Sequence, residues 1–221
     1  MIVLSDVLTP QESRAVREAL DAAPFRDGRV TAGPAAGKVK DNEQARGDDP
    51  GVMALAATVR RALDAQPVIR TLVRPVRWSS LIFSRYGSGQ QYGLHADNAA
   101  MVDEHGWPLR TDFSFTLFLS EPDAYEGGAL LIRDLSGDRE HRPPAGSMVL
   151  YPTGQLHRVM PVTRGVRLAC VGWVQSRIRR ADHREILHDL DRVRDAAGPE
   201  TEATLLLDKS IGNLLRMWSE D

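Results

Sequence analysis

The sequence predicts a mainly β protein with flanking helices, and three observations support this fold class. Six short runs rich in β-branched and aromatic residues lie between about Pro75 and Arg177, and glycine- or proline-containing segments separate them. In one of these runs, Phe113, Phe115, Leu117 and Leu119 alternate with Ser114, Thr116 and Phe118. Helical periodicity occurs before and after this segment. We therefore expect an antiparallel sandwich or barrel with N-terminal helices and a C-terminal helical segment.

Two helices are predicted before the β segment. Thr9-Pro10-Gln11-Glu12 combines a capping threonine, a proline at the first helical position and the glutamate of a capping box. Asp49-Pro50 begins a second helix, which we expect to run through Leu63. Between them, the glycine-, alanine- and proline-rich stretch Thr31–Lys38 is predicted to be a loop.

The predicted strands follow in order, and two further helices close the chain. The strand-like runs are Trp78–Tyr86, Arg110–Leu119, Ala129–Arg133, Ser147–Tyr151, Leu156–Val162 and Val166–Val174. The last two helices carry apolar stripes at helical spacing, Ile186, Leu187, Leu190 and Val193, and then Leu207, Ile211, Leu214, Leu215 and Trp218. We expect these helices to pack on the β core, although the same stripes also suit a dimer or partner surface.

Domain organisation and setting follow from length and composition. We expect residues 1–177 to form one domain, with its β core at about 70–177, and residues 178–221 to form a helical extension. The 28 basic and 30 acidic residues nearly cancel, which argues against a nucleic-acid groove or a polybasic membrane patch. No apolar run is long enough to span a bilayer, and residues 1–6 lack the features of a signal peptide. The single cysteine, Cys170, is predicted to be buried, and we expect a cytoplasmic protein.

The segment His95-Ala96-Asp97, together with His157, predicts a metal site. Residues i and i+2 of a strand point to the same face, so His95 and Asp97 can address one ion. His157 then arrives from another strand. Two imidazoles and one carboxylate leave positions open on a ferrous ion, as in non-heme oxygenases. Two surface histidines and a solvated aspartate would give the same pattern.

Arg167 is the predicted anion-binding residue. It follows His157 after the segment Thr163-Arg164-Gly165, which is predicted to be a turn. On adjacent antiparallel strands, Arg167 would lie deep in the barrel that holds His157. A buried guanidinium is costly unless an anion meets it, and a carboxylate matches its two-pronged geometry. A surface salt bridge is the alternative interpretation of Arg167.

These residues belong to a set of motifs that resembles the PKHD-type hydroxylases, a branch of the Fe(II)- and 2-oxoglutarate-dependent dioxygenases related to prolyl 4-hydroxylases. The matching segments include Arg85-Tyr86-Gly87, His95-Ala96-Asp97-Asn98, Arg110-Thr111-Asp112, Thr116-Leu117-Phe118-Leu119-Ser120, Tyr125-Glu126-Gly127-Gly128, Leu150-Tyr151-Pro152, Leu156-His157-Arg158-Val159, Arg167 and Trp173-Val174-Gln175-Ser176. The resemblance covers nearly the whole chain. It implies a double-stranded β-helix, or jelly-roll, core.

The resemblance also implies roles for individual residues. His95, Asp97 and His157 are expected to bind catalytic Fe(II), and Arg167 is expected to bind the far carboxylate of the cosubstrate 2-oxoglutarate, with ascorbate as a further cofactor. Tyr86 matches a tyrosine that can reach the cosubstrate, although a packing role fits it equally.

Three other segments are expected near the site, and their residues have alternative roles. Lys40 and Asn42 lie in a segment expected at the mouth of the active site, where they would contact substrate or solvent. Asp41 departs from the asparagine that is usual in the family, and the loop at 101–109 differs as well. Asn98 is expected either to steady Asp97 or to be a loop residue.

The function expected from this resemblance is hydroxylation of an unactivated C–H bond while 2-oxoglutarate becomes succinate and CO2. The substrate would be a small molecule, an amino acid or a peptidyl residue. The protein could also form a homodimer. Retention of Asp97 favours hydroxylation over halogenation; desaturation and cyclisation also fit. Two other classes fit the residues: a cupin-type enzyme independent of 2-oxoglutarate, and a non-catalytic sensor that binds metal or 2-oxoglutarate.

Overall fold

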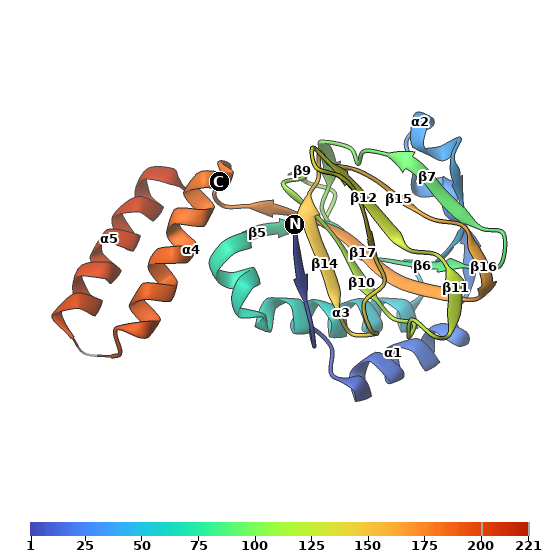
Figure 1. Cartoon of the computed structure of the whole chain (residues 1–221), viewed down its shortest axis with the longest axis horizontal. Helices are drawn as coiled ribbons and strands as arrows, with labels where there is room; N and C mark the ends of the chain where they lie inside the picture. Colours follow the sequence, from blue (N-terminus) through green and yellow to red (C-terminus); the bar gives the residue numbers. More distant parts are fainter. Residues whose placement is uncertain (200, 221) are drawn as a thin grey trace.

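The computed structural model describes residues 1–199 and 201–220, and it is built on two main antiparallel sheets (Figure 1). The larger sheet has the strand order β1 (Ile2–Leu4), β14 (Met148–Pro152), β10 (Phe113–Phe118), β17 (Arg167–Ser176), β6 (Ile82–Tyr86), β4 (Glu43–Ala45) and β2 (Phe25–Asp27), and β5 (Pro75–Trp78) pairs with β17. The smaller sheet has the order β13 (Gly137–His141), β12 (Leu130–Asp134), β15 (Leu156–Val159), β7 (Gln91–His95) and β3 (Lys40–Asp41). Two short ribbons pair β11 (Tyr125–Gly127) with β16 (Val162–Gly165), and β8 (Ala100–Val102) with β9 (Pro108–Arg110).

The predicted N-terminal helices are present and begin where their caps predict. Helix α1 spans Pro10–Asp21, and its capping box is complete, because Glu12 N donates to Thr9 Oγ1 at 3.2 Å and Thr9 N donates to Glu12 Oε2 at 2.9 Å. Helix α3 spans Pro50–Ala65, and the Asp49 side chain caps it. A π-helix, η2 (Ile69–Val73), follows α3.

The stretch Thr31–Lys38, predicted to be a loop, is partly helical. It contains the end of a 3-10 helix, η1 (Gly28–Thr31), and a short helix α2 (Pro34–Gly37). The proline that suggested a loop instead occupies the start of α2, where its missing N–H costs no hydrogen bond.

Two strand boundaries also differ from the prediction. The run Leu156–Val162 divides into β15 and β16, since Pro161 cannot donate to a ladder. The run Trp78–Tyr86 is also interrupted, since β5 ends at Trp78 and β6 begins at Ile82.

The alternation along β10 separates the apolar core from the functional side of the larger sheet. Phe115 and Leu117 are at most 1% exposed and belong to the core cluster that includes residues of α1 and α3. Ser114 and Thr116 are also buried, but they line a cavity on the opposite face. Cys170, on the neighbouring strand β17, is fully buried in the core cluster, as predicted. One strand thus supplies both packing and cavity residues.

The C-terminal helices α4 (Ala181–Ala196) and α5 (Glu202–Trp218) form a hairpin at one end of the molecule (Figure 1). The hairpin has its own small apolar cluster, in which Ile178, Leu187 and Ile211 are buried. Helix α4 packs against η2, and the carboxylate of Asp191 binds Arg74 at the end of η2.

No helix among the described residues is both long and apolar enough to cross a membrane.

Candidate metal and cosubstrate site

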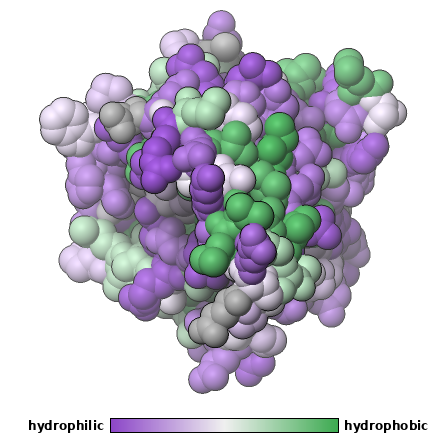
Figure 2. Space-filling model, turned by 90° about the vertical axis from the view of Figure 1, so that its left-hand side faces the viewer, coloured by the Kyte–Doolittle hydropathy of each residue, from purple (hydrophilic) through white to green (hydrophobic). Residues whose placement is uncertain are grey.

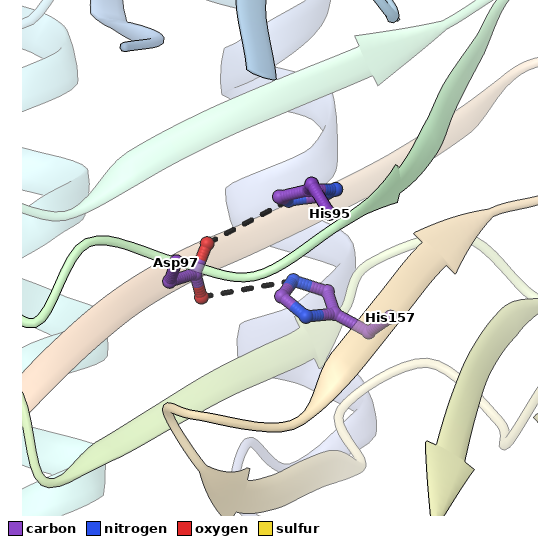
Figure 3. Close-up of side chains that lie close together, drawn as sticks. All are labelled: His95, Asp97 and His157. Carbon is purple, nitrogen blue, oxygen red and sulfur yellow. Dashed lines mark ion pairs between the residues drawn. The ribbon is translucent and has the colours of Figure 1, made fainter. Parts of the chain in front are cut away.

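Three predicted ligands, His95, Asp97 and His157, converge at one point (Figure 3). His95 is the last residue of β7, and His157 lies opposite it on the paired strand β15. One ligand atom from each residue lies within 4.8 Å of the others. Asp97 lies in the loop after β7, so the expectation that both residues of the pair sit on one strand is wrong. The chain turns after His95, and this turn still brings the carboxylate to the histidines.

The two imidazoles present the same nitrogen to the site. Nδ1 of His95 donates to the carbonyl of Gly93 at 2.8 Å, and Nδ1 of His157 donates to the carbonyl of Gln155 at 3.0 Å. A carbonyl only accepts, so each Nδ1 carries the proton and each Nε2 keeps its lone pair. Both Nε2 atoms lie 3.6 Å from oxygens of Asp97. Backbone hydrogen bonds of this kind fix the orientation of metal-binding histidines.

Two side chains of the larger sheet hold Asp97. Ser114 Oγ and Trp173 Nε1 each donate to Asp97 Oδ2 at 2.8 Å. Burial by itself raises the pKa of this carboxyl, but the two histidines and the two donors outweigh burial, so the pKa of Asp97 lies below its ordinary value. The sequence did not identify these donors. The one signal for Ser114 was its polar position in the alternating run of β10.

Asn98, predicted either to steady Asp97 or to be a loop residue, is not among the donors to Asp97 in the described structure. Its backbone carbonyl instead accepts a hydrogen bond from Thr111 Oγ1 at 2.6 Å. Asn98 therefore shapes the loop after β7, which agrees with the loop interpretation.

Aromatic rings enclose the histidines. Tyr92 stacks on His95 with ring centroids 3.7 Å apart, and Tyr151 lies 5.0 Å from His157 across the two sheets. Burial lowers the pKa of His157, although the charge of Asp97 opposes this shift. A neutral His157 is the form that binds a metal.

Arg167 is a buried cation with unmet hydrogen-bonding capacity. It is 1% exposed, and its Nε and Nη2 atoms have no hydrogen-bond partner among the described residues. Its strand β17 belongs to the larger sheet, whereas His157 belongs to the smaller one, so the predicted adjacency of their strands is wrong. The segment Thr163-Arg164-Gly165, predicted to be a turn, lies in strand β16, which pairs with β11 and carries the chain between the sheets.

Tyr86 lies opposite Arg167 in the register of β6 and β17. The Arg167 guanidinium carbon lies 5.3 Å from the centre of the Tyr86 ring, and Tyr86 lines the cavity, whereas Arg167 is not among the lining residues. Burial raises the pKa of Tyr86 to about 12, against the opposing charge of Arg167. The phenol is therefore neutral and can donate a hydrogen bond near physiological pH.

The triad opens into a cavity of about 580 Å³ between the sheets, a size that holds a small organic ligand. Besides the triad, the cavity is lined by Thr31, Lys40, Gln44, Tyr86, Tyr92, Met101, Asp103, Ser114, Tyr151 and Trp173, among others. Two imidazole nitrogens and a carboxylate oxygen fit a divalent iron with open positions. The unpartnered guanidinium of Arg167 fits a carboxylate.

Comparison with known proteins places this geometry in context. Residues 81–175 match the family model of the 2OG-Fe(II) oxygenase superfamily. A PKHD-type hydroxylase of Picosynechococcus sp. is 46% identical over 98% of both chains. A PKHD-type hydroxylase of Synechococcus elongatus is 43% identical over the full length of both chains.

Solved structures agree in fold. A Pseudomonas putida prolyl-4-hydroxylase is 21% identical, covers 80% of this chain and 92% of its own, and gives a TM-score of 0.56. HygX from Streptomyces hygroscopicus, solved with nickel and 2-oxoglutarate bound, is 16% identical over 80% of this chain and 83% of its own, also with a TM-score of 0.56. These likenesses confirm the predicted double-stranded β-helix fold.

Proposed function

The chain belongs to the PKHD-type hydroxylases of the 2OG-Fe(II) oxygenase superfamily, and we propose that it hydroxylates an unactivated C–H bond of a small-molecule, amino-acid or peptidyl substrate. As a 2-oxoglutarate-dependent dioxygenase, it uses Fe(II) and 2-oxoglutarate. The observation that supports the proposed site best is the pairing of a 2-His-1-carboxylate cluster with the unpartnered guanidinium of Arg167.

In this proposal His95, Asp97 and His157 are the catalytic metal ligands. The two Nε2 lone pairs and the carboxylate would hold Fe(II), while the backbone carbonyls and the donors Ser114 and Trp173 keep the three ligands oriented. Fe(II), when bound with 2-oxoglutarate and O2, supplies the oxidising power for C–H cleavage. The residues that orient the ligands restrict the motion of the three ligand side chains before the substrate binds.

Arg167 and Tyr86 would bind the cosubstrate. The two free nitrogens of Arg167 match the two oxygens of a carboxylate, so they would anchor the far end of 2-oxoglutarate. Tyr86, held neutral by burial, would donate to the same end. The surrounding rings of Phe118 and Tyr86 keep water away from this pair and strengthen it.

A turnover screen tests the proposed function. Purified protein with Fe(II), ascorbate and 2-oxoglutarate is incubated with amino acids, peptides and metabolites, and succinate and product masses are recorded. We expect one class of compound to gain one oxygen atom in step with succinate release. A compound that is converted equally well without 2-oxoglutarate would overturn the proposal. Loss of two hydrogens in place of oxygen gain would redirect it to desaturation or cyclisation.

We also propose that the hairpin α4–α5 forms a homodimer. Both helices carry exposed and partly exposed apolar residues that recur at intervals of three and four, as in coiled coils. On α4 they are Ile186, Leu190 and Val193, followed by Ala197 at its C-terminal cap, and on α5 they are Ala203, Leu206, Leu207, Leu214 and Met217, with Ser210 in the middle. Leu190 and Leu214 also pack, in part, against the hairpin's own cluster. Figure 2, which views this end of the molecule, shows a band of hydrophobic surface bordered by polar side chains.

The α5 stripe is complementary to a second copy of itself. In an antiparallel pairing about Ser210, the small Ala203 faces the large Met217, and Leu206 faces Leu214. Glu202, at the start of α5, comes close to Arg216 near its end. Self-complementarity of this kind is what a two-fold dimer interface requires.

We also propose that residues 1–177 form a dioxygenase domain and that residues 178–221 form a helical extension. A cytoplasmic location is the last part of this proposal.

A further inference from the structure

Lys40 is a buried lysine in the wall of the cavity. It is one of three lysines in the chain, with Lys38 and Lys209, although lysine and arginine together number 28. Lys38 and Lys209 are exposed, whereas Lys40 is 6% exposed. Lysine is almost never buried without a partner. The contacts of its ammonium group therefore indicate what Lys40 does.

The ammonium group of Lys40 has one protein acceptor among the described residues. Nζ donates to Thr31 Oγ1 at 3.1 Å, and Thr31 Oγ1 donates to Gln44 Oε1 at 2.8 Å. The adjacent carboxylate of Asp41 faces Arg29 instead, at 3.8 Å, and within the described chain Lys40 makes no salt bridge. An ammonium carries three N–H donors, so two of them remain available to a ligand.

Tyr92 connects Lys40 with the metal-ligand cluster. The two residues are paired in the register of β3 and β7, and Nζ lies 5.0 Å from the centre of the Tyr92 ring. The same ring stacks on His95. An anionic group held at Lys40 would therefore keep the rest of its molecule beside the triad, where a C–H bond is to be oxidised.

The charges of the cavity select the kind of anion. Among the described residues that line the cavity, Lys40 is the one lysine or arginine, and Asp103 adds a negative charge that does not belong to the metal-ligand cluster. A single ammonium neutralises one negative charge and leaves the second charge of a dianion unpaired. These charges favour a carboxylate over a phosphate dianion.

We propose that Lys40 binds a carboxylate of the prime substrate. This inference rests on the proposed function, because it adds a second anion beside the cosubstrate that Arg167 is proposed to hold. The two cations differ in kind. The guanidinium of Arg167 offers a planar fork, whereas the ammonium of Lys40 is a compact charge with freely rotating donors.

Competitive methylation of the three lysines tests this proposal. The full chain is loaded with Fe(II) and saturating 2-oxoglutarate without oxygen and is then treated with formaldehyde and a borane reductant. The probes are N-acetyl-L-leucine, its primary amide and phenyl phosphate. Peptide mass spectrometry gives the labelling rate of Lys40, with Lys38 and Lys209 as internal references in the same sample.

We expect the free acid to slow labelling of Lys40 about tenfold when it is present at ten times its Kd, with no effect on the two reference lysines. The amide should give no protection, and phenyl phosphate should give less than the acid. Equal protection by acid and amide, or no protection by the acid, would overturn the proposal. Stronger protection by phenyl phosphate would overturn the choice of a carboxylate.

A matched pair of variants separates this inference from the proposed function. Lys40→Met should weaken binding of the acid probe about tenfold or more, because a charged hydrogen bond is lost, whereas Lys38→Met should leave it unchanged. Both variants should keep the wild-type affinity for 2-oxoglutarate. If Lys40→Met instead abolishes 2-oxoglutarate binding and Arg167→Ala does not, Lys40 is the cosubstrate anchor and the inference fails. If the chain binds no 2-oxoglutarate at all, the proposed function fails.

Discussion

In the β core Arg167 is 1% exposed and two of its guanidinium nitrogens lack a partner among the described residues, whereas in the C-terminal hairpin Leu206 is 55% exposed. Both regions depart from ordinary packing: in the core a polar group is buried, and in the hairpin an apolar side chain is exposed. Buried polar groups are normally satisfied, so an unsatisfied one in a cavity indicates a small ligand. Exposed apolar side chains at regular spacing indicate contact with another protein surface. The two regions therefore suggest different partners.

The largest effect is expected from removal of the metal-binding carboxylate. Asp97→Ala leaves two imidazoles without the anionic ligand, so we expect 2-oxoglutarate-dependent succinate formation to be abolished. Succinate release by the purified variant measures this loss. Asp103→Ala, which removes another carboxylate of the cavity lining, is the control and should keep the metal-dependent reaction. Turnover by Asp97→Ala at the wild-type rate would refute the triad.

The next largest effect is expected from removal of Arg167, the buried cation of the β core. Arg167→Ala should leave iron bound but should weaken 2-oxoglutarate by about two to four decades, since losing one partner of a buried ion pair costs about 3–5 kcal/mol. Anaerobic calorimetric titration gives both affinities. Arg164→Ala is the control, because Arg164 is exposed and pairs with Glu126. An unchanged affinity for 2-oxoglutarate in Arg167→Ala would show that another group is the anchor.

Replacing Lys40 tests whether burial of its ammonium group, which is proposed to bind a ligand, lowers the stability of the folded protein. Burial lowers the pKa of Lys40 from 10.5 to about 8, although the charges of Asp97 and Asp27 oppose this shift. At pH 7 the folded chain therefore holds a destabilised ammonium, and Lys40→Met should stabilise the protein by up to about 3.5 kcal/mol, at about 1.4 kcal/mol per pKa unit.

The pH dependence of this effect has a defined sign. Between about pH 8 and 10.5 the unfolded chain keeps the Lys40 proton while the folded chain loses it. This group therefore makes wild-type stability rise with pH across that window, and the advantage of Lys40→Met should shrink there. Urea unfolding of the metal-free protein at pH 7 and pH 10 measures the difference, with Lys38→Met as the control. A variant less stable than wild type at pH 7 would contradict this account.

Substitutions at two neighbouring residues of α5 test the proposed dimer surface of the hairpin. Leu206→Glu places a charge in the apolar stripe and should weaken the proposed dimer about tenfold or more, because desolvating a carboxylate is costly. Leu205→Glu is a matched control, since Leu205 is 68% exposed but lies about 100° away around α5. Light scattering over a dilution series gives the mass of each variant. A wild-type chain that is monomeric at all concentrations would break the comparison between the two regions.

The sequence could predict those parts of the site that local patterns determine. His95, Asp97 and His157 stood out because their types and spacing suit a metal, and the alternation along β10 indicated a sheet with two different faces. The orienting roles of Ser114 and Trp173 could not be predicted. A strand pattern shows which face a side chain occupies, but the distant segment that it meets depends on how the sheets pack.

The same limit explains the errors of placement. Arg167 was identified by its chemistry, but its strand was assigned to the wrong sheet because nothing in the local sequence shows that β16 pairs with β11. Asp97 was placed on a strand that ends two residues earlier, at His95. Lys40 gave no local sign of burial, because its environment is created by Thr31 of η1, nine residues earlier, and by strand β7, which pairs with β3 from much later in the chain.

The most direct test of the proposed site is anaerobic titration of 2-oxoglutarate into the wild-type chain with and without Fe(II). We expect one equivalent of 2-oxoglutarate to bind, and to bind more tightly when Fe(II) is present. This gain should disappear in Asp97→Ala and persist, at much weaker overall affinity, in Arg167→Ala. Equal binding of 2-oxoglutarate with and without Fe(II) would show that the metal ligands and Arg167 do not form one site.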